Sequence, residues 1–263
     1  MIDDKIYRAV CELNGYSASL PTPTSDKVDY YERADYIYYM PMEEIRPPDT
    51  LVGSRITGQI LNNASLVEGR IDNGLNLDGI NQWVDLGNRR TECFGNLDLC
   101  PNGYSLSLWL KIGKTSGSLY YLSNGGQSGY SYGIALILQS NNILVMFNTN
   151  TKAWQVQHPS PTAGEWHHVV MTWRDLTAVT SKLALWWDGV NVATDNSSTS
   201  RNVPTTIYND FLIGRPNNNF HSYGEAVIDE LIFWDRELED ARIMSLWESY
   251  NDNLNFANTT IDP

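Results

Sequence analysis

The sequence predicts an all-β protein, built as a sandwich or barrel of antiparallel strands with one helix near its C-terminal end. Three observations lead to this prediction. Short apolar, aromatic and β-branched runs recur along the chain with turn residues between them. Asp188-Gly189 lies between two such runs, which is a strong hairpin signal. Apolar residues at helical spacing appear only after Glu237.

A three-strand meander is the clearest part of the pattern. Residues Trp166–Trp173 and Leu183–Trp187 are rich in aromatic and β-branched side chains, which suit a pleated, half-buried surface. Residues Val190–Ala193 follow directly after the Asp188-Gly189 turn. We therefore expect these three segments to be consecutive antiparallel strands.

The N-terminal part of the chain divides into three segments. Residues 1–34 are polar and contain Pro21 and Pro23, so we expect an arm or linker there. Residues 35–42 read as a first strand, which Pro41 confines to an edge. Residues 43–66 are expected to form an irregular segment. The folded domain is expected to span residues 35–250.

Further strands are expected in the middle and C-terminal parts of the chain. Tyr104–Ile112 alternates strictly, with leucines on one side and Ser105, Ser107 and Trp109 on the other, which indicates that one face lies in a core. Simple alternation in residues 226–233 places Val227, Asp229, Leu231 and Phe233 on one face. The remaining expected strands are 74–77, 82–86, 119–122, 132–138, 143–148, 152–157 and 211–214.

One helix is expected from Glu237 to about Tyr250. Leu238, Ala241, Ile243, Leu246 and Tyr250 recur at roughly helical spacing, and acidic residues occupy the first turn, where they suit the helix dipole. Residues 251–263 are expected to form a disordered tail or linker.

Composition limits the possible partners. The formal net charge of −13 argues against a nucleic-acid ligand, which needs a basic face. The sequence contains no apolar run long enough to insert into a membrane. An acidic surface is consistent with Ca²⁺ binding, but more often it only aids solubility.

The cysteines and glycosylation sequons favour an oxidising, extracellular location. Cys93 and Cys100 could form a disulfide or half a zinc site, and because no histidines have zinc-site spacing, we expect a disulfide. Cys11 is left over and could pair with another chain. No signal peptide is visible at the first residues. Asn-x-Ser/Thr sequons, which are candidate glycosylation sites, occur at Asn63, Asn196 and Asn258.

Five segments in this order resemble the concanavalin A-like lectin/glucanase superfamily, and specifically its laminin G-like and pentraxin-like branch. They are Leu77–Gly87, Tyr104–Lys111, Trp166–Trp173, Leu185–Gly189 and Ile228–Asp235. The resemblance implies a jelly-roll of two antiparallel sheets with a concave face and a helix packed beside it. It also implies a disulfide between Cys93 and Cys100 of the laminin G-like kind.

The chain departs from pentraxins at two places. The pentraxin disulfide would need cysteines at Val170 and near Ser107, and neither residue is a cysteine. The pentraxin calcium loop would fall at Gly214–Tyr223, which contains Arg215 and no carboxylate. The pentraxin phosphocholine site is therefore not expected.

Candidate ligand-binding residues lie on the sheet faces and on the rim loops. Trp186 and Trp109 could stack on a sugar, or they could be packed under a covering segment, which is the usual state of large aromatic residues. The loop that contains Asn217, Asn218 and Tyr223 is a further candidate, because function concentrates on loops held by a rigid scaffold. The other candidate rim loops are 124–129, 148–152 and 195–202.

The resemblance also implies a structural Ca²⁺ held by Asp229, since some jelly rolls of this superfamily bind calcium through the matching aspartate. Glu43 or Glu44 could supply a second carboxylate, and Asp78 is a further possibility. The alternative is an Asp229 carboxylate that accepts hydrogen bonds from backbone N–H groups.

Three functions remain open at this stage. The first is a non-catalytic extracellular module for adhesion, matrix assembly or self-association, which would bind a protein partner or another copy of itself. The second is a carbohydrate-binding lectin module. The third is a glycoside hydrolase, but the spacing of Glu225, Asp229 and Glu230 does not match the Glu-x-Asp-x-x-Glu pattern of hydrolases in this superfamily.

Overall fold

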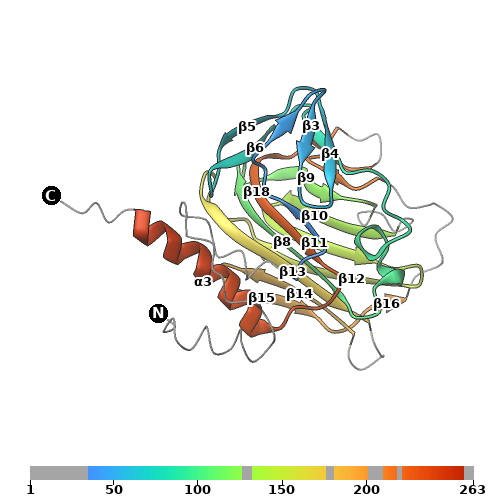
Figure 1. Cartoon of the computed structure of the whole chain (residues 1–263). Helices are drawn as coiled ribbons and strands as arrows, with labels where there is room; N and C mark the ends of the chain where they lie inside the picture. Colours follow the sequence, from blue (N-terminus) through green and yellow to red (C-terminus); the bar gives the residue numbers. More distant parts are fainter. Residues whose placement is uncertain (1–34, 126–131, 176–180, 201–209, 218–220, 258–263) are drawn as a thin grey trace, which may run out of the picture.

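The computed structural model describes residues 35–125, 132–175, 181–200, 210–217 and 221–257, with side chains through Ser249. Two antiparallel sheets are stacked on each other, and one long helix lies across the outside of one sheet (Figure 1). The fold prediction is confirmed. No helix in the described part of the chain is long and apolar enough to span a bilayer.

The first sheet has eight strands in the order β15-β14-β13-β8-β18-β6-β5, with β1 also paired to β18. The meander predicted around Asp188-Gly189 forms one side of this sheet. Asp188 has φ 51° and Gly189 has φ 76°, which are the positive values that a type I′ hairpin turn requires. The strands are β15 Val190–Asp195, β14 Lys182–Trp187, β13 Trp166–Arg174, β8 Tyr104–Ile112, β18 Glu225–Trp234, β6 Asn73–Asp78, β5 Ser65–Glu68 and β1 Tyr38–Met40.

The second sheet has ten strands in the order β16-β12-β11-β10-β9-β17-β7-β4-β3-β2. The adjacent strands β10 and β11 place Leu136, Val145 and Phe147 in the sandwich core, whereas Ala135, Ile137 and Leu144 form a separate apolar cluster. The strands are β16 Thr199–Ser200, β12 Lys152–Pro159, β11 Asn142–Asn148, β10 Gly133–Ser140, β9 Gly117–Ser123, β17 Leu212–Ile213, β7 Trp83–Asp85, β4 Thr57–Leu61, β3 Thr50–Val52 and β2 Ile45–Arg46.

The prediction of an irregular segment at residues 43–66 was wrong. This stretch contains β2, β3, β4 and the start of β5. The strands are only two to five residues long, so their alternation is too brief to recognise in sequence. Asn62 and Asn63, with φ 56° and 58°, form the turn between β4 and β5.

The sandwich core lies between the two sheets and follows the alternation predicted for β8. Leu106, Leu108 and Leu110 all lie in it and are at most 1% exposed. The β13 residue Trp173 and the β14 residue Trp187 point into the same core. At about 25 cal/mol per Å² of apolar surface buried, this layer supplies most of the driving force for folding.

Simple alternation fails in β18. Its pairing with β8 shifts register between Asp229 and Ile232, and Glu230 has φ 54°. This bulge adds one residue to β18 and so shifts the alternation of its side chains between the two faces. As a result Ile228, Leu231 and Phe233 all lie in the sandwich core. Asp229 therefore does not share a face with Leu231 and Phe233, contrary to the sequence prediction.

The helix α3 (Asp240–Ala257) lies against part of the outer face of the eight-stranded sheet (Figure 1). Ile243 and Leu246 of α3 pack with Trp186, Trp234 and Val170 in a second apolar cluster. Trp247 lies over Trp109 at a ring distance of 5.6 Å. The helix continues seven residues past Tyr250, so the prediction that the whole of 251–263 is a tail was wrong for 251–257.

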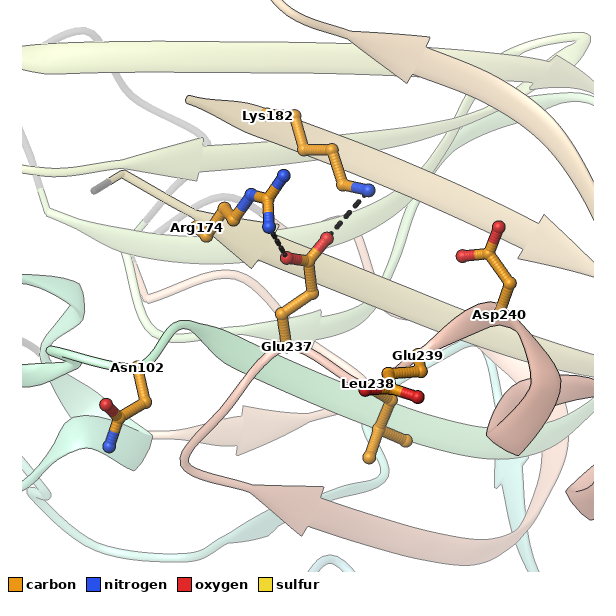
Figure 2. Close-up of a pocket in the computed structure, with 7 residues that line it drawn as sticks. All are labelled: Asn102, Arg174, Lys182, Glu237, Leu238, Glu239 and Asp240. Atoms are coloured by element: carbon orange, nitrogen blue, oxygen red, sulfur yellow. Dashed lines mark ion pairs between the residues drawn. The ribbon is translucent and has the colours of Figure 1, made fainter. Parts of the chain in front are cut away.

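An ion-pair cluster anchors the connection between β18 and α3 to the sheet. The Glu237 carboxylate forms ion pairs with Arg174 of β13 at 3.0 Å and with Lys182 of β14 at 2.8 Å (Figure 2). The Glu237 side chain is only 13% exposed. These three residues line a pocket of about 460 Å³ that also contains Asp240 at the start of the helix.

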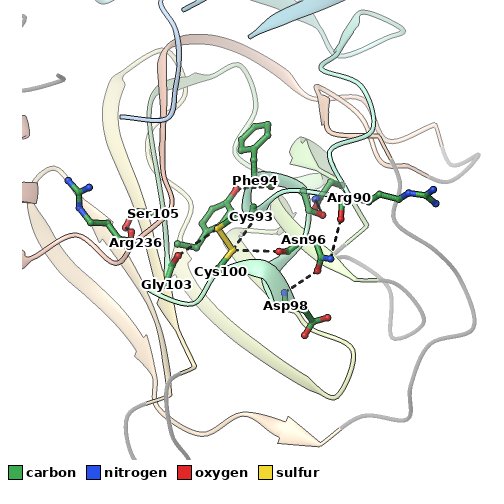
Figure 3. Close-up of a disulfide and its surroundings, with 12 residues drawn as sticks. Arg90, Cys93, Phe94, Asn96, Asp98, Cys100, Gly103, Ser105 and Arg236 are labelled. Atoms are coloured by element: carbon green, nitrogen blue, oxygen red, sulfur yellow. Dashed lines mark hydrogen bonds between the residues drawn. A yellow bond between two sulfur atoms is a disulfide. The ribbon is translucent and has the colours of Figure 1, made fainter. Parts of the chain in front are cut away.

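The predicted disulfide between Cys93 and Cys100 is present (Figure 3). It closes a loop that contains two short 3-10 helices, η1 Cys93–Gly95 and η2 Leu97–Leu99. Asn96 joins them, because its side-chain oxygen accepts the backbone N–H of Asp98 at 3.0 Å. Val170 and Ser107 are cross-strand partners, which matches the positions expected for the absent pentraxin disulfide.

Candidate functional site

An arginine held between two aromatic rings forms the most distinctive surface cluster on the described rim. We call Trp83, Arg215 and Tyr223 the Arg215 cluster. The guanidinium carbon of Arg215 lies 4.6 Å from the centre of the Trp83 ring and 5.8 Å from that of Tyr223. All three side chains are partly exposed. Cation–π contacts of this kind contribute roughly 0.5–2 kcal/mol, so the rings restrain the arginine.

Local backbone features bring these residues together. Strands β7 and β17 are neighbours in the ten-stranded sheet. Trp83 is the first residue of β7, and Gly214 directly follows the last residue of β17. Gly214 has φ 91°, and a side chain there would come within 2.9 Å of Leu77. Only glycine fits this turn without strain, and it directs Arg215 back toward Trp83.

Hydrogen bonds hold the rest of this rim loop. The Ser123 hydroxyl donates to Asn217 Oδ1 at 2.7 Å, and the Asn217 amide donates to the carbonyl of Asp210. Tyr223 forms a parallel bridge with Tyr120 of β9. The predicted ligand residues Asn217 and Tyr223 therefore lie in one loop region, with Asn217 bonded to its own scaffold. Asn218 lies outside the described residues.

One carboxylate lies near the cluster. Burial and the neighbouring Asp210 raise the pKa of Asp85, while the Gly87 N–H bond and the charge of Arg215 lower it, and the net direction is upward. Asp85 Oδ1 accepts the Gly87 N–H at 2.7 Å, which fixes the carboxylate. The cluster thus offers a positive group, aromatic edges and a fixed acceptor on one part of the rim, which is a set of contacts suited to a polar ligand.

Trp186 and Trp109 are not open for stacking on a sugar in this structure. Trp186 is 5% exposed and lies beneath α3, and Trp109 is 1% exposed between Arg70 and Trp247. Both rings are therefore packed under a covering segment, which was the alternative to sugar stacking. The covering segment is the C-terminal helix rather than a rim loop.

The predicted calcium ligands are only partly brought together. Asp229 is fully buried, and its Oδ2 accepts the N–H groups of Arg70 at 2.9 Å and Ile71 at 3.0 Å. Its Oδ1 has no hydrogen-bond partner among the described residues. Burial and the nearby charges of Glu230 and Glu43 raise the pKa of Asp229 to about 8, although the two N–H bonds lower it.

Of the three predicted second carboxylates, Glu43 is the one whose charge raises the pKa of Asp229. It accepts the backbone and side-chain N–H groups of Asn73, and burial raises its pKa. Glu44 instead forms an exposed ion pair with Arg46. Asp78 Oδ1 accepts three backbone N–H groups of its own turn. Within the described ranges, no group of three or more acidic, histidine or cysteine side chains is arranged around a cation.

The carboxylates of β18 do not form a hydrolytic pair. Glu225 forms an ion pair with Lys114, while Asp229 is buried four residues further along the strand. Four strand residues span about 13 Å, whereas glycosidase carboxylates lie about 5–9.5 Å apart.

Of the predicted glycosylation asparagines, Asn63 and Asn196 are exposed, and Asn258 lies outside the described residues. Cys11 also lies outside them, together with the predicted arm 1–34. The contact between Trp83 and Arg215 could not be predicted from the sequence, because it joins two residues far apart in the chain.

Comparisons with solved structures show the same fold. The binding domain of botulinum neurotoxin DC in complex with rat synaptotagmin II matches with a TM-score of 0.61 at 12% identity, over 82% of this chain and 52% of that chain. The binding domain of Paraclostridial Mosquitocidal Protein 1 matches with a TM-score of 0.62 at 13% identity, over 83% and 53%. The binding domain of botulinum neurotoxin DC in complex with SialylT matches with a TM-score of 0.58 at 11% identity, over 82% of this chain and 52% of that chain.

This chain therefore spans about half the length of each of these structures. No curated protein matches the chain in sequence. A family model described as the concanavalin A-like lectin/glucanases superfamily, of the laminin G type, matches residues 78–244, which include the strands from β7 to β18 and the start of α3. The chain belongs to this superfamily.

Proposed function

We propose that this protein is a non-catalytic binding module whose contact surface includes the Arg215 cluster. The observation that carries the proposal is the partly exposed Arg215, whose guanidinium lies between Trp83 and Tyr223 at the rim of a rigid sandwich. A restrained arginine loses little conformational freedom on binding, so it is suited to recognition. The separation of Glu225 and Asp229 supports a role without catalysis.

The ligand class that we place first is a protein, either a partner or a second copy of this chain, in adhesion or matrix assembly outside the cell. The Cys93–Cys100 disulfide supports an oxidising compartment. A neurotoxin binding domain that matches this fold over 52% of its length was solved in complex with synaptotagmin, which supports a protein ligand.

A glycan is the second candidate. Aromatic rings, an arginine and side-chain amides are found together at the rim, and this combination can contact sugar rings and hydroxyl groups. A structure of similar fold was solved with SialylT.

Paired measurements separate the two candidates. A glycan array in the presence of Ca²⁺ should give hits that Arg215→Ala removes and that the exposed-arginine control Arg90→Ala retains if the ligand is a sugar. Solution mass before and after reduction should show a concentration-dependent dimer if the chain associates with itself. Glycan hydrolysis that is lost on replacing Glu225 or Asp229 would contradict the proposal.

We also retain a structural Ca²⁺ as a proposal, with Asp229 and Glu43 as its protein ligands. The buried Asp229 Oδ1, which lacks a hydrogen-bond partner in the described structure, fits a cation. Glu44 and Asp78 are left out, because only Glu43 of the three predicted partners lies close enough for its charge to raise the pKa of Asp229. A ligand that binds only the folded state raises the melting temperature. Equal melting temperatures in Ca²⁺ and in EDTA would exclude the ion.

A further inference from the structure

A continuous set of buried contacts joins the disulfide to the Arg215 cluster. We call residues 93–100, which the bond between the two terminal cysteines closes, the disulfide loop (Figure 3). Phe94 of this loop stacks on Phe211, with ring centres 4.3 Å apart and ring planes 10° from parallel. Both rings are at most 2% exposed. Because protein interiors are closely packed, a displacement of Phe94 is transmitted to Phe211.

Phe211 in turn connects the two strands that carry the Arg215 cluster. Its N–H donates to the carbonyl of Gly87 at 3.0 Å, and its carbonyl accepts the N–H of Leu86 at 2.9 Å. These two residues directly follow β7, the strand that begins with Trp83. Phe211 directly precedes β17, and Arg215 lies two residues after that strand. The position of Phe211 therefore helps to set the spacing between Trp83 and Arg215.

The conformation of the disulfide loop depends on its covalent bond. The loop contains two 3-10 helices of three residues each, which are short elements with poor hydrogen-bond geometry. None of residues 93–100 belongs to a strand or forms an isolated bridge in the structure. Single hydrogen bonds join the loop to neighbouring segments, for example from the Asn124 side chain to the Gly95 carbonyl at 3.1 Å. Opening the bond therefore gives the loop, and Phe94 with it, more conformations to adopt.

The bond also lies within reach of a small thiol. Cys93 is partly exposed, and Cys100 lines a pocket of about 430 Å³ at the end of the sandwich. Leu99, on the wall of the same pocket, is 45% exposed, so the pocket opens to solvent. Access matters because thiol–disulfide exchange requires direct attack of a thiolate on a sulfur atom.

We propose that the Cys93–Cys100 disulfide is a redox control of the Arg215 cluster, an inference that rests on the binding function proposed for that cluster. The oxidised form holds Phe94 against Phe211 and keeps the cluster assembled. Reduction releases Phe94 and loosens the cluster. The module therefore binds its ligand in an oxidising compartment and loses affinity in a reducing one.

The reductant is a dithiol, and the exchange balances within the two molecules. One thiolate of the reductant attacks one sulfur of the bond and forms a mixed disulfide, while the other cysteine leaves as a thiolate and takes up a proton. The second thiol of the reductant then attacks the mixed disulfide and releases the first cysteine. The protein gains two electrons and two protons, and the reductant becomes a disulfide.

The test compares the oxidised protein with the dithiothreitol-reduced protein by NMR, in a Cys11→Ser background so that only this bond responds. Thiol counting confirms complete reduction. The reporters are the Trp83 indole resonance, assigned by its loss in Trp83→Phe, and hydrogen exchange at the Phe211 N–H. The distant reporter is the Trp186 indole, which is buried under α3. We expect reduction to shift the Trp83 resonance, to accelerate exchange at Phe211 about tenfold or more, and to leave Trp186 unchanged.

A pair of matched variants tests the route through the stacked rings. Phe94→Leu keeps the disulfide but removes the stacked ring, so it should shift the Trp83 resonance of the oxidised protein and leave reduction without further effect. Leu99→Ala changes an exposed side chain of the same loop and should keep both the oxidised spectrum and its response to reduction. If Phe94→Leu does not fold, the double variant Cys93→Ser with Cys100→Ser decides, because it should reproduce the reduced spectrum without a reductant.

Three results would overturn the proposal. They are an unchanged Trp83 resonance after complete reduction, an equal response of the Trp186 resonance, and a full response to reduction in Phe94→Leu. The NMR test contains no ligand, so its outcome is separate from that of the binding function, which Arg215→Ala tests.

Discussion

Replacing Glu237 by glutamine should loosen the attachment of α3 to the sheet. The Glu237 side chain, 13% exposed, accepts two cationic groups at 3.0 and 2.8 Å, so the variant loses two charge-assisted contacts at once. A hydrogen bond to a charged group contributes about 1.5–3 kcal/mol when it is well buried. Arg174 is 34% and Lys182 is 26% exposed, so solvent screening reduces this value. We therefore expect a total loss of about 1–3 kcal/mol.

The loss should appear in chemical denaturation as a lower midpoint with an unchanged slope. It should also appear in thermal melting as a decrease of about 2–4 °C for each kcal/mol. Glu239→Gln is the matched control, because Glu239 is exposed and lines the same pocket without an ion pair in the described structure. If the two variants are equally stable, the three-residue ion-pair cluster does not anchor the helix as we infer.

Three other changes test further parts of the structure. Burial lowers the pKa of His168 to about 3, against an ordinary value near 6.5, so the unfolded chain binds a proton that the folded chain does not. Its contribution to stability is therefore complete above pH 6.5 and decreases toward pH 3, by up to about 1.4 kcal/mol per pH unit, and denaturation of His168→Gln should lack this part of the slope. Cys93→Ser with Cys100→Ser should reduce stability by about 2–3 kcal/mol, and an unchanged melting temperature would show that the loop needs no cross-link. Gly189→Ala should destabilise the protein more than Gly87→Ala, because both glycines have positive φ but only at Gly189 does an added carbon come within 2.6 Å of Trp247; melting curves that coincide would count against close packing of α3 on this turn.

The positions of most strands and of the helix near the C-terminal end could be predicted from sequence, because each depends on local patterns. The alternation of Tyr104–Ile112 and the turn at Asp188-Gly189 are clear without tertiary information. The bulge at Glu230 could not be predicted, because a non-glycine residue with positive φ is uncommon and the pairing with β8 determines it.

The candidate site was predicted less well, because its contacts join distant parts of the chain. The loop with Asn217 and Tyr223 could be chosen from its polar composition, but its pairing with Trp83 depends on the order of β7 and β17 in the sheet. The exposure of Trp186 and Trp109 depends on where α3 docks. Local alternation places the two rings on the outer face but does not show what covers that face.

The central claim is that the rim around Arg215 recognises a ligand. It is tested most directly by biolayer interferometry of the wild type and Arg215→Ala on immobilised glycans and on immobilised copies of the protein. The account predicts saturable binding by the wild type to one of these surfaces, and a loss of about tenfold or more in affinity (about 1.4 kcal/mol) for the variant. Equal affinity of the two proteins would contradict it.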